Sequence, residues 1–202
     1  MKIPKKFHSI WVHGSPENQW EHFNQGWMYH HPGWQHVNWF AGTAPINRKE
    51  FDSVSDLRIK ANILKYEILL THGGVVIDQD FECLRCIEPL IGGADLFSAT
   101  EDGKHVSVGI LGCCQWDPFM SKVVENVPAA IAAGDRCGVS FFTEMVNLYK
   151  PDISIFPPEL FYPYTGTDLR FGRTVDSMKP FPGAYAVHHW AALQDRFGEA
   201  LT

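Results

Sequence analysis

The chain has 202 residues, of which 45% are hydrophobic and 20% are charged, and its formal net charge at pH 7 is −6. This composition is typical of a folded domain with a sizeable core, and the acidic balance argues against nucleic acid or an anionic membrane surface as a partner. No stretch reaches the ~20 apolar residues of a membrane span, so we expect one domain over residues 1–202 without an integral membrane segment.

The N-terminal segment and the cysteines both bear on the compartment. The start, MKIPKKFHSIW, carries basic residues but lacks the long apolar run of a signal peptide. Five cysteines are an odd number for a disulfide framework in a domain of this size, which favours reduced thiols and a cytoplasmic protein. A zinc site built from Cys83 and Cys86 with two other cysteines is an alternative, although a second pair at matching spacing is missing.

The first predicted elements are a strand, a turn and a long helix. The strand lies in FHSIWVHG, which begins at Phe7, and the turn lies in HPGW, from His31 to Trp34. Apolar residues at helical spacing predict a helix over Ser55–His72, with Ser53 or Ser55 as its N-terminal cap.

The remainder of the chain alternates strands with helices. Strands are predicted in ADLFSAT from Ala94, SVGILGC from Ser107, SIFPPELFYP from Ser154 and GAYAVHHW from Gly183; helices are predicted over Asp117–Ala133 and Val139–Lys150. Interleaved strands and helices indicate an α/β fold with a mostly parallel central sheet flanked by helices. Ligands of such folds bind beyond the carboxyl ends of the strands.

Two carboxylates follow a buried strand in the segment GGVVIDQDFECL, which begins at Gly73. The glycines end the preceding helix, and Val75–Ile77 reads as a core strand that stops at Asp78 and Asp80. Residues i and i+2 of an extended chain point to the same side, so both carboxylates can bind one hard cation such as Mg²⁺ or Mn²⁺. The alternative is a chance triplet on a solvated turn of an acidic protein.

The context of this triplet resembles glycosyltransferase family 32, the sugar-binding DXD transferases. The segments IPKKFHSIWVHG, KANILKYEILLTHGGVVIDQDFECL and YAVHHW are similar to three signatures of that family, in the family's order. CGVSFFTEMV, from Cys137, and FPPELFYP, from Phe156, resemble two further segments. The resemblance implies a single GT-A domain over the whole chain, a nucleotide-diphosphate sugar donor and a divalent metal, Mn²⁺ or Mg²⁺.

The same resemblance implies roles for residues near the two strand ends. Asp78 and Asp80 would bind the metal and the ribose or diphosphate of the donor, and Trp11 with Val12 would bracket the nucleotide base. An aromatic ring can stack on a base, but core packing is the alternative for Trp11. Where most family members carry Asp and Arg on the preceding helix, this chain has Asn62 and Lys65, which puts the identity of the donor in doubt.

The C-terminal HHW segment and an acidic loop supply the remaining candidates. His188 is expected to be a metal ligand or a diphosphate contact, while His189, its strand neighbour, should turn away from the metal and is kept as a donor-binding candidate. Glu101 and Asp102 are the best candidates for the acceptor side, against the alternative of a solvated acidic turn. Asp78, Asp80 and Glu101 are therefore the catalytic candidates.

The leading hypothesis is a metal-dependent transferase that moves a hexose from a UDP-sugar, or a GDP-sugar, to a hydroxyl on a glycan, lipid or protein. A metal-dependent sugar-nucleotide hydrolase or phosphodiesterase would use the same carboxylates with water as the acceptor. A non-catalytic module that binds sugar nucleotides is the third possibility, and the departures at Asn62 and Lys65 suggest it.

Overall fold

The computed structural model describes residues 2–12, 21–40 and 42–191. Its strands are β1 (Lys6–Trp11), β2 (Gln35–Phe40), β3 (Gly74–Ile77), β4 (Phe81–Cys83), β5 (Leu96–Thr100), β6 (Val106–Cys113), β7 (Ser154–Phe156) and β8 (Ala186–His188). Its helices are α1 (Glu21–His30), α2 (Arg48–Ser53), α3 (Leu57–His72), α4 (Glu88–Ile91), α5 (Pro118–Ala132), α6 (Val139–Tyr149), α7 (Pro158–Phe161), α8 (Gly166–Arg170) and α9 (Val175–Met178).

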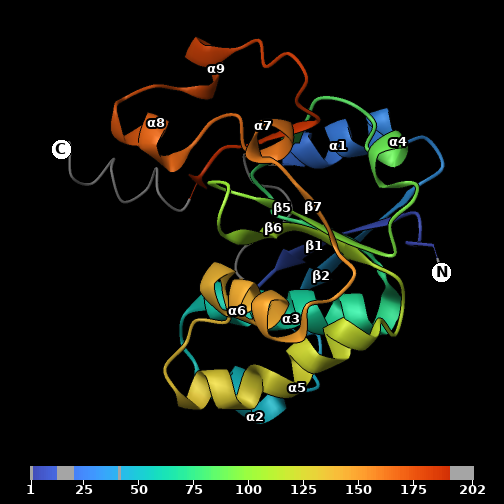
Figure 1. Ribbon diagram of the computed structural model, residues 1–202, viewed down its shortest axis with the longest axis vertical. Helices are drawn as coiled ribbons and strands as arrows, with labels where there is room; N and C mark the ends of the chain where they lie inside the picture. The colour runs from blue at the N-terminus through green and yellow to red at the C-terminus, as the bar shows by residue number, and fades with distance from the viewer. Residues whose placement is uncertain (1, 13–20, 41, 192–202) are drawn as a thin grey trace.

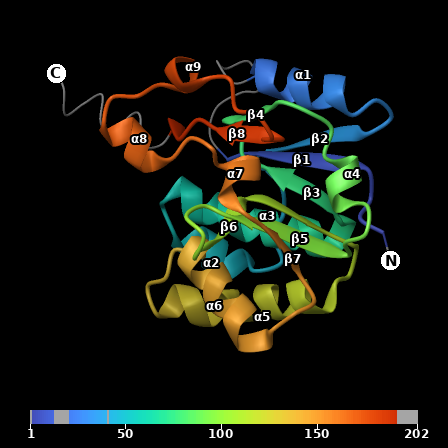
Figure 2. The same ribbon diagram turned by 45° about the horizontal axis from the view of Figure 1, so that its top comes forward.

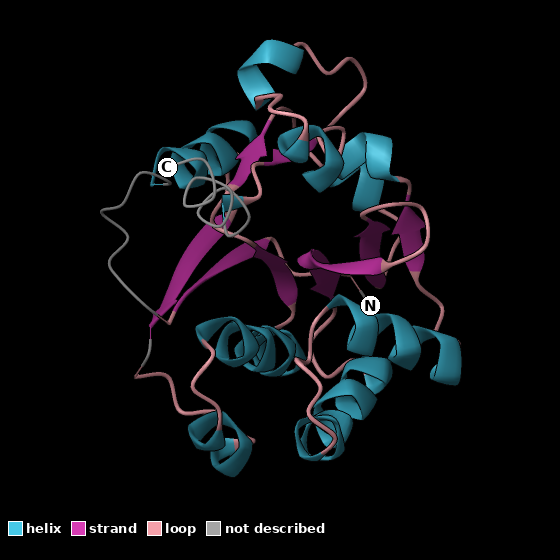
Figure 3. Ribbon diagram, turned by 90° about the vertical axis from the view of Figure 1, so that its left-hand side faces the viewer, coloured by secondary structure: helices cyan, strands magenta, loops and turns pink. Residues whose placement is uncertain are grey.

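A central sheet lies between two layers of helices. Helices α2, α3, α5 and α6 cover one side, and α1, α4 and α7 lie on the other (Figures 1 and 3). The strand order is β2-β1-β3-β6-β5-β7, in which β1 is parallel to β2 and β3, and β5 is parallel to β7. The predicted α/β fold with a mostly parallel sheet is confirmed.

Strand β6 is the antiparallel member of the central sheet. It pairs antiparallel with both β3 and β5, and it follows β5 after a short loop. Antiparallel strands can be joined by so short a connection, whereas parallel neighbours need a longer crossover. As a result, β6 runs back beside the carboxyl end of β3.

Two apolar clusters fill the spaces on either side of the sheet. Alternate residues of β3 divide between them: Val76 packs with α3, α5 and α6, while Val75 and Ile77 pack with residues such as Trp27 and Phe81. Burial on both faces explains why this strand reads as a continuous apolar run. Because both faces of β3 pack against apolar side chains, the strand holds the position of Asp78, which follows it.

The connection from α3 to β3 depends on two glycines. Gly73 has φ 59° and Gly74 has φ 94°, as the sequence predicts for the end of this helix. An added Cβ at Gly73 would lie 2.6 Å from the backbone nitrogen of Gln115, so a side chain there would also clash. At the other end of α3, the cap is Asp56 and not Ser53 or Ser55, since the Asp56 side chain accepts the N–H of Arg58.

The C-terminal predictions require two corrections. The segment from Ser154 forms only the short strand β7 before α7 begins, because its consecutive prolines cannot supply ladder N–H groups and the second starts a helix. The closing strand exists as β8, but it pairs antiparallel with β4 in a separate two-stranded sheet (Figure 2). This pairing brings the HHW segment directly beside the chain that follows Asp80.

Across the described ranges, none of the helices combines the length and the apolar character that crossing a bilayer requires.

The buried His8 makes the fold sensitive to acid. The indole N–H of Trp39 donates to Nδ1 of His8 at 2.9 Å, so Nε2 carries the proton and donates to the carbonyl oxygen of Gly73 at 2.8 Å. Burial is the main cause that lowers the pKa of His8 from 6.5 to about 4. Protonation of His8 at Nδ1 breaks the hydrogen bond from Trp39 and leaves a charge inside the protein. The unfolded chain bears neither cost, so protonation favours unfolding.

We expect the free energy of unfolding to fall by about 3 kcal/mol between pH 6.5 and pH 4 on account of His8. The sign follows because the folded pKa is depressed: in this range the unfolded chain binds a proton that the folded chain does not. Urea denaturation at several pH values measures the slope. His8→Gln, which cannot titrate, should be less stable at pH 7 and should have a shallower slope; an identical slope would contradict the assignment to His8.

Candidate active site

A cavity of about 420 Å³ opens beyond the carboxyl end of β3. It is lined by residues from the end of β1 (Ile10 and Val12), from α3 (Leu57, Arg58, Ala61, Asn62 and Lys65), from the end of β3 and beyond (Ile77, Asp78, Gln79 and Asp80), from the β5–β6 region (Glu101, Val108 and Gly109), and from Val139, His188, Trp190 and Ala191. Segments from most of the described sequence thus meet at one place. This is the place where α/β sheets commonly bind ligands.

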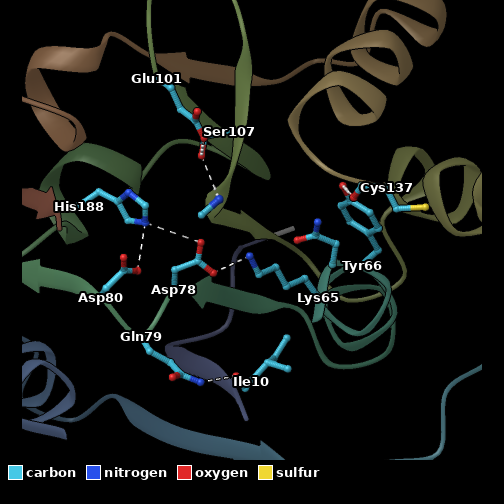
Figure 4. Close-up of polar contacts among 12 residues, drawn as sticks. Ile10, Lys65, Tyr66, Asp78, Gln79, Asp80, Glu101, Ser107, Cys137 and His188 are labelled. Carbon is cyan, nitrogen blue, oxygen red and sulfur yellow. Dashed lines mark hydrogen bonds and ion pairs between the residues drawn. The ribbon is translucent and has the colours of Figure 1, made fainter. Parts of the chain in front are cut away.

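Asp78 lies at the centre of the cavity wall and is held by two elements. Its backbone N–H donates to the carbonyl oxygen of Gly109 at 2.8 Å, which fixes the chain as it leaves β3. Its Oδ1 lies 2.5 Å from Nζ of Lys65, whose side chain is only 7% exposed (Figure 4). The helix before the strand therefore places a cation directly against the first carboxylate.

Asp80 is paired with His188 across the β4–β8 junction. Nε2 of His188 lies 3.1 Å from Oδ1 of Asp80 and 3.9 Å from Oδ2 of Asp78. The other carboxylate oxygen of Asp80 accepts the N–H of Ala191 at 2.7 Å. The expectation of an extended chain through Asp78 and Asp80 is wrong, because Gln79 and Asp80 lie in a turn that the N–H of Phe81 closes on the carbonyl oxygen of Asp78 at 3.1 Å. The side chain of Gln79 donates to the carbonyl oxygen of Ile10 at 2.5 Å, so it does not join the two carboxylates.

His188 and Asp80 each favour the charged form of the other. Burial acts to lower the pKa of His188, but the attraction of Asp80, its hydrogen bond and the charge of Asp78 outweigh burial, so the pKa is raised above 6.5. Burial likewise acts to raise the pKa of Asp80, and the protonated imidazole outweighs it and lowers that pKa. Without a metal, Lys65 and His188 are thus the cations that neutralise the two aspartates.

Asp78, Asp80 and His188 form a candidate metal site. Each offers one ligand atom, and these atoms lie within 4.8 Å of one another. Two carboxylate oxygens and one imidazole nitrogen are a donor set that fits a divalent cation and leaves positions for other oxygen ligands. The cysteines contribute to no comparable group in the described part of the chain, and all five are free.

An aromatic enclosure fixes the orientation of His188. The imidazole lies 4.8 Å from the ring of Phe81, 5.6 Å from that of Tyr162 and 4.5 Å from that of Trp190, measured between ring centroids. Trp190 in turn donates its indole N–H to the carbonyl oxygen of Tyr164 at 2.9 Å. Sequence reasoning assigned no role to Tyr162, although the FPPELFYP segment that contains it resembles a family motif.

The structure separates Glu101 from its neighbour Asp102. Glu101 lines the cavity, and burial is the main cause that raises its pKa. Asp102 lies in an exposed turn, where it accepts the backbone N–H groups of Lys104 and His105. The solvated-turn alternative therefore describes Asp102, and Glu101 remains the candidate for the acceptor side.

Four of the donor-binding candidates line the cavity, namely Val12, Asn62, Lys65 and Asp78. The expectation for Trp11 needs correction: its ring is 1% exposed and its indole N–H donates to Oδ1 of Asn38 at 2.9 Å. A ring with so little exposed surface is not accessible to a base in this structure, so the core-packing alternative describes Trp11.

His189 faces away from the metal candidates, as the alternation of strand neighbours predicts. Its Nε2 lies 2.9 Å from Oε2 of Glu82, and its ring contacts that of Phe23 at 4.7 Å between centroids. His189 is not among the cavity-lining residues. The expectation that His189 contacts the donor therefore needs correction, because its side chain contacts Glu82 and Phe23 and does not line the cavity.

Comparison with known protein sequences points to one kind of protein. The family described as "Glycosyltransferase sugar-binding region containing DXD motif" matches residues 17–97. Inositol phosphoceramide mannosyltransferase 3 of Schizosaccharomyces pombe (strain 972 / ATCC 24843) is 26% identical over 134 residues, which cover 62% of this chain and 37% of the relative. Alpha-1,4-N-acetylglucosaminyltransferase of Homo sapiens is 26% identical over 150 residues, which cover 66% of this chain and 43% of the relative. The chain thus spans less than half the length of these curated relatives.

Solved structures agree on the fold. PaToxG glycosyltransferase superposes with a TM-score of 0.61 at 12% identity, over 73% of this chain and 70% of that one. A glycosyltransferase involved in glycosylation of the major capsid of PBCV-1 superposes with a TM-score of 0.56 at 12% identity, over 96% and 98%. By sequence, residues 17–97 are therefore similar to the sugar-binding DXD region of glycosyltransferases, and by fold the chain is similar to solved GT-A glycosyltransferases.

Proposed function

We propose that this protein is a metal-dependent glycosyltransferase that moves a hexose from a nucleotide-diphosphate sugar to a hydroxyl on a glycan, lipid or protein. A UDP-sugar is favoured over a GDP-sugar. The observation that carries the proposal is the convergence of Asp78, Asp80 and His188 at the edge of the cavity. Relatives named as a mannosyltransferase and an N-acetylglucosaminyltransferase support the transfer of a sugar.

Asp78, Asp80 and His188 are the residues that would hold Mn²⁺ or Mg²⁺. The carboxylate oxygens suit both ions, and the imidazole nitrogen suits the transition metal better. When bound, the metal would supply stabilisation of the charge that develops on the departing diphosphate. Lys65, already 2.5 Å from Asp78, would add a second positive charge on the same side of the cavity.

The test uses manganese and a panel of nucleotide sugars. Because a ligand that binds the folded state raises its stability, donors are first ranked by the shift in melting temperature with and without Mn²⁺. Nucleotide release is then measured with and without an acceptor mixture. Release that depends on the acceptor supports the transferase, release without it indicates a hydrolase, and binding without release indicates a non-catalytic module. A panel without any stabilising donor would contradict the proposal.

Restoring the family's residues at Asn62 and Lys65 should change the choice of sugar more than the affinity for UDP. Both side chains line the cavity on α3, and in the proposal they face the sugar end of the donor. We expect Asn62→Asp combined with Lys65→Arg to reorder the donor panel, because Arg adds a planar fork of donors and Asp removes an amide donor. Calorimetric titration with UDP and with each UDP-sugar measures the difference. Equal effects on UDP and on UDP-sugars would show that these residues do not contact the sugar.

The cytoplasmic location stands as part of this proposal. The five free cysteines support a reducing compartment.

A further inference from the structure

Behind the cavity wall lies Ser107, a fully buried residue of β6 whose hydroxyl contacts three polar groups. It accepts the backbone N–H of Gly109 at 2.9 Å, and its Oγ lies 3.2 Å from Oε1 of Glu101. It also forms a hydrogen bond with the hydroxyl of Tyr162, which is itself a buried residue. Figure 4 shows Ser107 between Glu101 and the backbone of β6.

The direction of these hydrogen bonds follows from counting protons. A serine hydroxyl has one proton and two lone pairs, and the N–H of Gly109 uses one lone pair. If Ser107 donates to the carboxylate of Glu101, its second lone pair accepts the hydroxyl of Tyr162 and every proton has an acceptor. The reverse direction would leave the buried Tyr162 proton with no acceptor among the contacts of the described residues.

Gly109 shows how closely this group approaches the candidate metal site. A Cβ built on Gly109 would lie 2.8 Å from the hydroxyl of Tyr162 and 3.0 Å from Oδ2 of Asp78. Only a residue without a side chain lets the tyrosine and the aspartate come so near. Glu101 and Asp78 therefore line one cavity, with the Ser107–Tyr162 pair directly behind its wall.

We propose that Tyr162 and Ser107 are positioning residues that hold Glu101 as an ionised hydrogen-bond acceptor, so that its other carboxylate oxygen receives the hydroxyl of the sugar acceptor. The inference rests on the proposed transferase function and names the group that recognises the acceptor. Burial is the main cause that raises the pKa of Glu101, and the charge of His188 and the hydrogen bond from Ser107 oppose that effect. The charges of His188, Asp78 and Lys65 act on the same carboxyl group.

The first experiment requires no substrate. The side-chain carboxyl carbon of Glu101 is assigned by comparison with Glu101→Gln and followed by NMR over pH in the metal-free protein. Tyr162→Phe and Ser107→Ala should each raise the pKa of Glu101, because each weakens the hydrogen bond that favours the carboxylate. Tyr164→Phe is the matched control, since Tyr164 is also a buried residue and its hydroxyl donates to the carbonyl oxygen of Arg173, outside this group. An unchanged Glu101 titration in both variants would overturn the inference.

The second experiment uses the donor that stabilises the wild type and a reactive acceptor. Tyr162→Phe should lower kcat about fivefold to tenfold with the KM for the donor unchanged, the cost of one hydrogen bond. In a Glu101→Gln background the same change should cost nothing further, whereas a purely structural role would lower kcat in both backgrounds. If Tyr162→Phe lowers kcat by the same factor in the wild-type and Glu101→Gln backgrounds, the inference is overturned. A wild type without turnover would contradict the proposed function, and the NMR titration would still decide whether Tyr162 and Ser107 position Glu101.

Discussion

Asp80→Asn is expected to abolish manganese-dependent binding of UDP while the protein remains folded. The substitution removes one of the two carboxylates of the candidate metal site, and we expect a loss on the order of 100-fold or more in affinity. Asparagine keeps an oxygen that can accept the N–H of Ala191, so the backbone contact to this residue survives. Asp80→Ala would in addition remove that contact and leave buried His188 without its partner.

Calorimetric titration of UDP with and without Mn²⁺ measures the effect, and the melting temperature without ligand checks the fold. Asp52→Asn is the matched control, since Asp52 is an exposed carboxylate on α2 whose partner is Arg48. Unchanged UDP affinity in Asp80→Asn would remove this carboxylate from the metal site. Asp78→Asn should behave similarly but should also free Lys65, so its effect is less specific.

His188→Ala should weaken the binding of Mn²⁺ and UDP by roughly 10-fold to 100-fold, and His189→Ala should have a much smaller effect. The two neighbours differ because His188 faces both aspartates, whereas His189 contacts Glu82. Each substitution removes one imidazole from the same short segment. A loss of affinity in His188→Ala alone would indicate a role at the metal, whereas equal losses in both variants would indicate that either change destabilises β8.

The pH dependence gives His188 a second signature. A ligand imidazole must be neutral, and the aspartates raise the pKa of His188 above 6.5 in the metal-free protein. Affinity for Mn²⁺ should therefore weaken as pH falls through that raised pKa, and so at a higher pH than for an isolated histidine. Titration with Mn²⁺ between pH 5.5 and 8.5 measures the profile. His188→Ala with the same profile as the wild type would exclude this residue as a ligand.

In the metal-free state the same histidine affects stability in the opposite sense. Its raised pKa means that the folded chain holds a proton more tightly than the unfolded chain. The resulting stabilisation is fully present below pH 6.5 and is lost as pH rises through the folded pKa. Low pH therefore stabilises the folded protein without metal, whereas we expect higher pH to favour the binding of Mn²⁺.

The sequence predicted the elements whose residues follow a clear period. Helix α3, strand β3 and the sharp turn between them have strong signals, namely apolar spacing, a β-branched run and two glycines. The position of Asp78 and Asp80 followed from this local pattern. Short or half-polar elements such as α1 and β2 were not predicted, since mixed polarity hides both periods.

Contacts between distant segments were harder to predict. No local pattern indicates that β8 leaves the central sheet to pair with β4, or that the ring of Trp11 turns into the protein while Val12 lines the cavity. The enclosure around His188 and the contacts of Ser107 likewise join residues that lie far apart in the sequence. Only the packed structure specifies these partners, because side-chain direction depends on register and on the neighbouring elements.

The pairing of β8 with β4 has a consequence for the order in which the protein acquires its site. Asp80 and Ala191 are 111 positions apart, and His188 belongs to the last described strand. During synthesis the chain emerges from its N-terminus, so the two aspartates and Lys65 are made well before the histidine. An unfinished chain that has already formed α3 and β3 holds the carboxylates with only the lysine beside them. The complete set of three candidate ligands is therefore assembled only when β8 has paired with β4. In the proposed metal-dependent transferase, metal affinity would thus report that folding is complete.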